Sequence, residues 1–289
     1  MMVFLQAVAN GVMLGGVYAA AGVGLSLIFG VTGIVNAAHG ELMMLGAFTT
    51  YWLARSHGVD PLLSLPVAFL LLATFGYGLQ RFVLNRSVEA PLLVSLLATF
   101  GLSLVLVNAA LRLWSADYRV LSVPYLDRSL HLGEVVLPYT RLVAGGLGLL
   151  MVAGLSALLA RTPLGRAMRA TAQDWEMAQL AGIDTRRVFA LTVALGVGVT
   201  GAAGSLVAYF TNIHPYMGLT YTLFAFAVVV LGGMGYIPGV LYGGLAIGLA
   251  QAFTETYLEA GLSLMVAFLL LYVMLSLRPA GITGRGRVE

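Results

Sequence analysis

The sequence predicts a single-domain, all-α protein (residues 1–289) that crosses a membrane several times. Apolar residues make up 60% of the chain and charged residues only 9%, whereas a soluble domain carries about 25% charged residues. Several apolar runs reach the roughly 20 residues that a helix needs to cross a bilayer. Glycine-rich stretches interrupt these runs, which predicts broken helices. We therefore expect about eight to ten membrane-spanning helices.

Four apolar runs in the first part of the chain predict the first four spans. The first covers Val3–Phe29, and because no basic segment precedes it, we interpret it as a span rather than a signal peptide. The stretch Gly30–Phe48 then interrupts the helical character, and the second span ends near Ala54. The third and fourth spans cover about Leu62–Leu79 and Pro91–Leu111.

The second part of the chain begins with the longest segment expected to be non-helical, Arg112–Leu137. A fifth span follows at Pro138–Ala160, and a sixth ends at about Phe210. The segment Tyr221–Gly244 contains a second glycine-rich break, so we expect one span before it and another after it. The last span covers Leu262–Leu277.

The distribution of arginines predicts the orientation. The Arg161–Arg187 loop, the loop with Arg81 and Arg86, and the C-terminal tail all fall on one side, which the positive-inside rule assigns to the cytoplasm. The long Arg112–Leu137 loop then lies outside. This count also places the N-terminus outside, but no charge supports that placement, so its side stays open.

The Arg161–Arg187 loop holds eight of the charged residues and predicts an amphipathic surface helix. Thr162 can cap it, Pro163 suits its first turn, and Gly182 suits the position just past its end. The helix would carry one apolar stripe and one polar stripe. These stripes consist of Leu164, Met168, Ala172 and Trp175, and of Arg166, Arg169 and Gln173. Such a helix between two spans is suited to bind a soluble partner.

The densest cluster of polar residues within the apolar runs is Asn36, His39 and Glu41. Polar groups inside a membrane are functional candidates, so this cluster could line a translocation path or a hinge. It could equally be a helix end whose side chains satisfy freed backbone groups. No second His or carboxylate follows at a metal-ligand spacing, so we expect neither a metal site nor catalysis.

The second break contains Gly232, Gly233, Gly235 and Pro238. It could lie beside a translocation path at membrane depth, or it could be a tight loop. A similar pattern, a glycine-rich break followed by an apolar helix, occurs after Gly30, and inverted-repeat transporters show such a repetition. An internal inverted repeat is therefore one expectation. Cysteine is absent, which excludes thiolate chemistry. The arginines lie at span ends rather than in one patch, so we expect no nucleic-acid partner.

Five segments of the chain have a specific pattern, namely Asn10–Ala19, Gly24–Ala47, Thr162–Asp184, Val228–Gly248 and Arg278–Gly284. Together they resemble the permease subunits of ABC importers of the branched-chain amino acid type, and among them the shorter of the two permease kinds. The resemblance covers nearly the whole chain.

The resemblance implies a role for the Arg161–Arg187 loop. ABC importer permeases carry a cytoplasmic E-A-A-x-x-x-G loop whose helix docks on an ATPase, and Glu176, Ala178 and Gly182 match it in register. Met177 replaces the first alanine of the motif. The residues expected to couple to the ATPase are therefore Arg166, Arg169, Asp174, Glu176, Ala178 and Gly182.

The same resemblance implies the partners. Two cytoplasmic ATPase subunits would bind ATP and Mg, while this chain would hold no cofactor. A second permease, either a longer relative or another copy, and an extracytoplasmic binding protein would complete a complex in the membrane of a bacterial or archaeal cell, with the C-terminus in the cytoplasm. The solute would be a branched-chain or related amino acid, an amide or urea. The alternative is a secondary transporter or facilitator that needs no ATPase.

Overall fold

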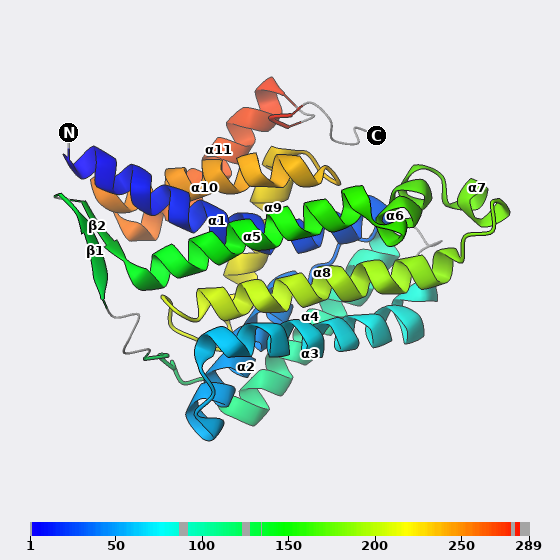
Figure 1. Cartoon of the computed structure of the whole chain (residues 1–289), viewed down its shortest axis with the longest axis horizontal. Coiled ribbons are helices and arrows are strands. Elements are labelled where there is room, and N and C mark those ends of the chain that lie inside the picture. The colour runs from blue at the N-terminus through cyan, green and yellow to red at the C-terminus, as the bar shows by residue number, and fades with distance from the viewer. Residues whose placement is uncertain (1, 87–91, 123–127, 134, 279–280, 284–289) are drawn as a thin grey trace.

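The computed structural model describes residues 2–86, 92–122, 128–133, 135–278 and 281–283, and these form a helical bundle (Figure 1). The helices are α1 (Met2–Thr32), α2 (His39–His57), α3 (Pro61–Phe82), α4 (Leu92–Trp114), α5 (Tyr139–Arg161), α6 (Pro163–Gln173), α7 (Trp175–Leu180), α8 (Thr185–Val207), α9 (Met217–Gly232), α10 (Ile237–Tyr257) and α11 (Ser263–Leu277). Two short 3₁₀ turns, at Leu84–Arg86 and Ala260–Leu262, and a β hairpin complete the described part.

Seven of the described helices are long and apolar enough to cross a membrane, namely α1, α3, α4, α5, α8, α10 and α11 with the turn before it. The apolar helix α9 is shorter, and α2 starts inside the bundle. These two account for the remaining helices of the expected eight to ten. The prediction of a polytopic, all-α membrane protein is confirmed.

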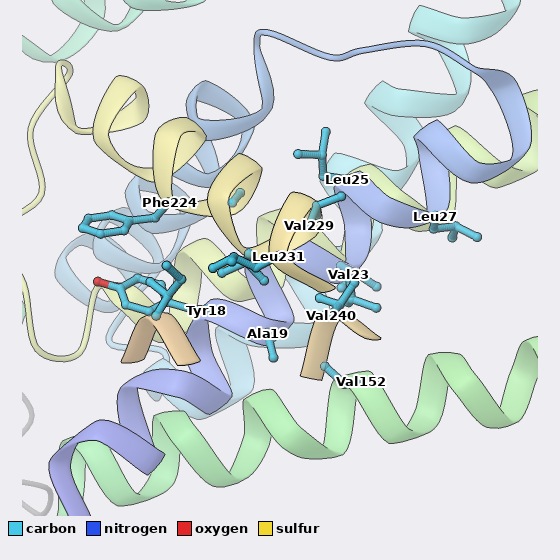
Figure 2. Close-up of a cluster of buried hydrophobic side chains, with 14 of the residues drawn as sticks. Tyr18, Ala19, Val23, Leu25, Leu27, Val152, Phe224, Val229, Leu231 and Val240 are labelled. Atoms are coloured by element: carbon cyan, nitrogen blue, oxygen red, sulfur yellow. The ribbon is translucent and has the colours of Figure 1, made fainter. Parts of the chain in front are cut away.

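Helices α1 and α8 form the centre of the bundle. In their most apolar stretches 83% and 89% of the residues are buried, against 22% in α3 and α4. Figure 2 shows part of the core around α1, where Tyr18 lies near Phe224 of α9 and Val23 lies near Val240 of α10. The rings of Tyr18 and Phe224 stack with their centroids 5.0 Å apart. The outer helices expose apolar side chains, which suits contact with lipid.

Glycines allow α1 to touch its neighbours backbone to backbone. A Cβ atom added to Gly16 would lie 2.5 Å from the carbonyl oxygen of Gly145 in α5, and one added to Gly248 of α10 would lie 2.3 Å from the backbone nitrogen of Gly15. No other residue fits such approaches. Membrane helices without a hydrophobic driving force between them depend on this close packing.

The pair Gly145 and Gly146 offers a test of that packing. A Cβ atom on Gly145 would lie 2.7 Å from the carbonyl oxygen of Met13, whereas nothing lies within 4 Å of one on Gly146. We expect Gly145→Ala to lower the melting temperature of the detergent-extracted protein by several degrees, because α1 and α5 must move apart. Gly146→Ala should leave it unchanged or raise it, since alanine favours a helix by about 0.5–1 kcal/mol over glycine. Equal melting temperatures for the two variants would contradict this account.

The two ends of the bundle differ. Helices α6 and α7 lie at one end, and the hairpin of β1 (Ser129–Leu132) and β2 (Val135–Pro138) lies at the other (Figure 1). The Gln6 side chain donates to the Val136 carbonyl (2.7 Å) and accepts from its backbone N–H (2.8 Å). The N-terminal end of α1 therefore lies at the same end of the bundle as the hairpin.

The segment expected to be non-helical, Arg112–Leu137, begins later in the structure and ends in a hairpin. Helix α4 extends to Trp114, and the antiparallel hairpin closes the segment. Between them, Arg119 forms an isolated bridge with Ile213 in the loop after α8. The bridge joins the two loops at this end of the bundle.

Candidate functional site in the bundle and at its α6–α7 end

The chain between α1 and α2 turns back into the bundle without helical structure. Helix α1 ends at Thr32, Gly33 reverses the chain with a φ of 68°, and α2 begins at His39. The His39 Nε2 atom lies 2.8 Å from the carbonyl oxygen of Ala21. Ala21 is about 16 Å from the end of α1 by helical rise, and the six residues 33–38 can span about 20 Å. Polar residues are therefore held at mid-depth of the bundle.

Side chains of two elements satisfy this irregular backbone. The Asn36 Oδ1 atom accepts from the backbone N–H of Ala38 (3.1 Å). Thr99 of α4 accepts from the N–H of Ala37 (3.1 Å) and donates to the carbonyl of Val35 (3.0 Å). Such backbone is tolerated inside a membrane only where protein or a cavity surrounds it. Asn36 thus bonds to a backbone group that the end of the helix leaves free, as the second of the two interpretations expected.

His39 and Glu41 lie in the first turn of α2 and are 0% and 3% exposed. The Glu41 carboxylate lies beside Gly218 of α9, where an added Cβ would be 3.0 Å from Oε1. Ser103 of α4 is within hydrogen-bonding reach of the carboxylate, while Oε2 has no partner among the described residues. The helix start favours this negative charge. A buried carboxylate with an oxygen that lacks a partner among the described residues is costly.

Thr99 and Ser103 were not among the site residues predicted from the sequence, although their spacing could have indicated them. Ser95, Thr99 and Ser103 follow one another at four-residue spacing in an otherwise apolar span, which places them on one face of α4. Ser95 and Thr99 are buried. Among the described residues no three His, Cys, Asp or Glu side chains come together as a metal could require.

The second break is a turn between α9 and α10 at the α6–α7 end of the bundle. Helix α9 ends at Gly232. In the turn that follows, Gly233 and Gly235 have φ values of 98° and 79°. Helix α10 then begins, with Pro238 in its first turn. An added Cβ on Gly30 would lie 3.0 Å from the Gly235 Cα, so the two breaks touch. The break has the geometry of a turn at this end of the bundle, and a role beside the translocation path stays a prediction.

The C-terminal segment covers the same turn. The backbone N–H of Ile282 donates to the Leu231 carbonyl (2.8 Å), and the Thr283 hydroxyl donates to the Gly232 carbonyl (2.8 Å). These bonds satisfy carbonyls that the end of α9 leaves free. The described part of the C-terminal segment therefore lies at the same end as α6 and α7.

The single helix expected over the loop is wrong, because the chain breaks at Asp174. Asp174 has extended backbone angles (φ −157°, ψ 104°), and its side chain accepts from the N–H of Met177 (2.9 Å). It therefore caps a second helix instead of continuing the first. Thr162 caps α6 as expected and accepts from the N–H of Gly165 (3.0 Å). Gly182 closes α7 with a φ of 89°.

Helix α6 rests on the end of α5. Met168 and Thr171 are buried, and a Cβ atom on Gly165 would lie 2.2 Å from the Leu159 carbonyl oxygen. Arg169 donates to the same carbonyl. Arg169 therefore ties the loop to the bundle, while Arg166 is exposed.

Helix α7 projects its side chains away from the bundle. Trp175, Met177 and Leu180 are 37%, 63% and 83% exposed, whereas Ala178 is 5% exposed. The expected apolar stripe thus ends at Ala172, because Trp175 belongs to the next helix. Glu176 lies in the first turn of α7, whereas a single helix ending just before Gly182 would have placed it near the C-terminal end. The N-terminal position favours its charge.

Comparison with known proteins assigns a family. The sequence model of the family "Branched-chain amino acid transport system / permease component" matches residues 7–275. The chain is 34% identical to the high-affinity branched-chain amino acid transport system permease protein BraD of Pseudomonas aeruginosa, over 99% of this chain and 97% of BraD. It is 33% identical to the corresponding protein LivH of Escherichia coli, with the same coverage of both chains.

A more distant match is the permease protein LivM of Escherichia coli, 24% identical over 92% of this chain and 67% of LivM. No solved structure matches the chain. The family model covers nearly all the described spans, including the return of the chain into the bundle and the α6–α7 end. The chain belongs to the family of branched-chain amino acid transport permease components.

Proposed function

We propose that this chain is the permease subunit of an ATP-driven importer for branched-chain or related amino acids, and that α6 and α7 transmit the action of the ATPase. One observation carries the coupling role. Helix α7 exposes Trp175, Met177 and Leu180 at one end of a membrane bundle (Figure 1), and an apolar surface outside the membrane is suited to a protein partner.

The orientation follows from this assignment. The end with α6, α7 and the C-terminal segment faces the cytoplasm of a bacterial or archaeal cell, and the hairpin end faces outward. Two cytoplasmic ATPase subunits bind ATP and Mg, and an extracytoplasmic binding protein delivers the solute to the hairpin end. The similarity to LivM supports a longer permease as the second membrane subunit.

Mechanistically, ATPase states would change the position of α7, and α6 would transmit the change to α5. Arg169 and Gly165 attach α6 to the Leu159 carbonyl at the end of α5, and α5 touches α1 through Gly145. A ligand shifts a conformational equilibrium only by its different affinity for the two states. The contacts at Leu159 and between Gly145 and Gly16 thus connect the loop to α1, whose Ala21 carbonyl bonds to His39.

Reconstituted uptake tests the proposal. The chain is purified with its ATPase, second permease and binding protein, and placed in proteoliposomes with radiolabelled leucine, isoleucine or valine outside and ATP inside. We expect accumulation that stops without ATP or without the binding protein. Equal uptake with and without ATP would favour a facilitator. Uptake of an amide or urea in place of these amino acids would change the substrate class but leave the coupling role intact.

Single cysteines test the orientation, because the chain has none of its own. We expect an impermeant maleimide to label Ala116→Cys in intact cells and Gln179→Cys only after permeabilisation. Both residues are exposed, whereas Thr171 is 2% exposed and unsuited to labelling. Labelling of Gln179→Cys from outside would reverse the orientation and remove the basis of ATPase coupling.

A further inference from the structure

A polar cavity of about 660 Å³ lies between the end of α3 and the start of α8. Its lining includes Tyr77 and Arg81 of α3, Asn85 of the following turn, and Asp184, Arg186 and Arg187 at the start of α8. The three arginines are exposed. Nothing in the transport mechanism above uses this cavity, which stands on the same end of the bundle as α7.

The charge of the cavity selects an anion. The lining holds three arginines and one carboxylate, and the Asp184 Oδ1 atom is already the acceptor for the backbone N–H of Arg187 (3.0 Å). Arg81 donates one hydrogen bond to the Tyr77 hydroxyl (3.3 Å). An arginine has five N–H donors, so most remain for a ligand, and a phosphate group suits their fork geometry.

A buried glutamine orients a further donor. Gln80 is 0% exposed, and its Nε2 atom donates to the Asn85 Oδ1 atom (3.1 Å). The acceptor of the Asn85 amide is thereby occupied, which leaves its NH₂ group for the cavity. The lining therefore presents donors and positive charge, the complement of a phosphate.

The same face of α3 continues into the membrane as an apolar surface. Leu70 shares this face with Tyr77 and Arg81, is 64% exposed and lies about 17 Å from Arg81 by helical rise, which is roughly the depth of one leaflet. Leu71 and Phe75 beside it are 51% and 37% exposed. A ligand held by the cavity therefore has an apolar surface directly below it. This combination fits a molecule with an anionic head and hydrocarbon chains rather than an acidic protein segment.

We propose that the cavity binds the phosphate of an anionic phospholipid, with the acyl chains along the exposed apolar residues of α3 nearest to it, Leu70, Leu71 and Phe75. Basic pockets between membrane helices recognise such headgroups, and each arginine near the surface strengthens the attraction. The site borders the loop between α7 and α8, so a bound lipid would help to hold the start of α8.

The test measures lipids that stay bound to the complete transporter complex. The wild-type complex in nanodiscs of phosphatidylglycerol and phosphatidylcholine should retain phosphatidylglycerol preferentially, as read by native mass spectrometry. Arg81→Gln/Arg186→Gln should weaken retention about 10- to 30-fold. Arg81→Lys/Arg186→Lys keeps the charge and should retain most of the lipid, which separates lost binding from misfolding. The control Arg55→Gln/Arg278→Gln changes two arginines outside the cavity and should match the wild type.

Two further measurements distinguish a lipid headgroup from free phosphate, and a lipid from a protein partner. Inorganic phosphate added in millimolar excess should not displace the lipid, because the acyl chains contribute; complete displacement would overturn the lipid assignment in favour of a free phosphate site. If the Arg81→Gln/Arg186→Gln complex retains as much phosphatidylglycerol as the wild type, the lipid assignment is also overturned. If that variant keeps its lipid but loses the ATPase, the cavity is a protein contact and the proposal fails.

Discussion

Gly182→Val is expected to reduce solute-stimulated ATP hydrolysis at least about tenfold while leaving the membrane bundle folded. Gly182 has a φ of 89°, where a β-branched residue costs about 1–3 kcal/mol. Helix α7 has six residues, too few to be stable alone. It depends on the Asp174 cap and on closure after Ala178, whose carbonyl accepts from the N–H of Ile183 (3.0 Å). The strain therefore falls on the weakest helix and reorients its exposed side chains.

The measurement combines co-purification of the ATPase with stimulated hydrolysis in proteoliposomes. Gly182→Asn is the matched control, because asparagine tolerates the left-handed conformation and should retain most of the stimulation. No atoms lie within 4 Å of an added Cβ at Gly182, so crowding does not explain a loss. If Gly182→Val and Gly182→Asn stimulate hydrolysis equally, the conformation of α7 does not matter for coupling.

Glu41→Gln is expected to lower solute uptake about tenfold or more while the complex still assembles. The carboxylate is buried between α2, α4 and α9, with Oε2 unpartnered among the described residues. Glutamine keeps its size and its bond to Ser103 but removes the charge, so the thermal stability should not fall. We expect the charge to be used during transport, because an ionisable group buried within membrane helices is costly and marks a functional candidate.

Uptake of labelled solute is the measurement, and Glu259→Gln is the control because Glu259 is exposed at the hairpin end. Melting temperatures of both variants show that folding is intact. Normal uptake by Glu41→Gln would mean that the charge is not required, and the buried carboxylate would then be only part of the helix start.

Features that depend on neighbouring residues were predictable from the sequence. Thr162 caps α6, and Gly182 closes α7 in the left-handed conformation, because both roles follow from local backbone chemistry. The sequence also allowed Asp174 to cap a helix, but this possibility was missed because the apolar stripe of a single helix was extended to Trp175. The stripe was inferred from periodicity over many residues, and periodicity does not reveal a single residue at which a helix ends.

Features that depend on distant contacts were not predictable. The sequence showed that helix α1 would end before Asn36, but not that His39 returns to the Ala21 carbonyl deep in the bundle. That depth depends on Thr99, which lies in another span. Likewise, Arg169 was assigned to a partner from its polar stripe, whereas its bond to Leu159 requires the position of α5. Burial of Glu41 by α4 and α9 follows from the same assembly.

The most direct test of the central claim is cross-linking of α7 to the ATPase. Leu180 is 83% exposed at the end of α7, so Leu180→Cys should form a disulfide with a cysteine introduced into the docking groove of the ATPase. The yield should change when ATP is added, and Ala116→Cys at the opposite end should give none. A cross-link at Leu180 that follows ATP would support coupling through α7. Recovery of the active complex with no cross-link from any exposed position of α7 would contradict it.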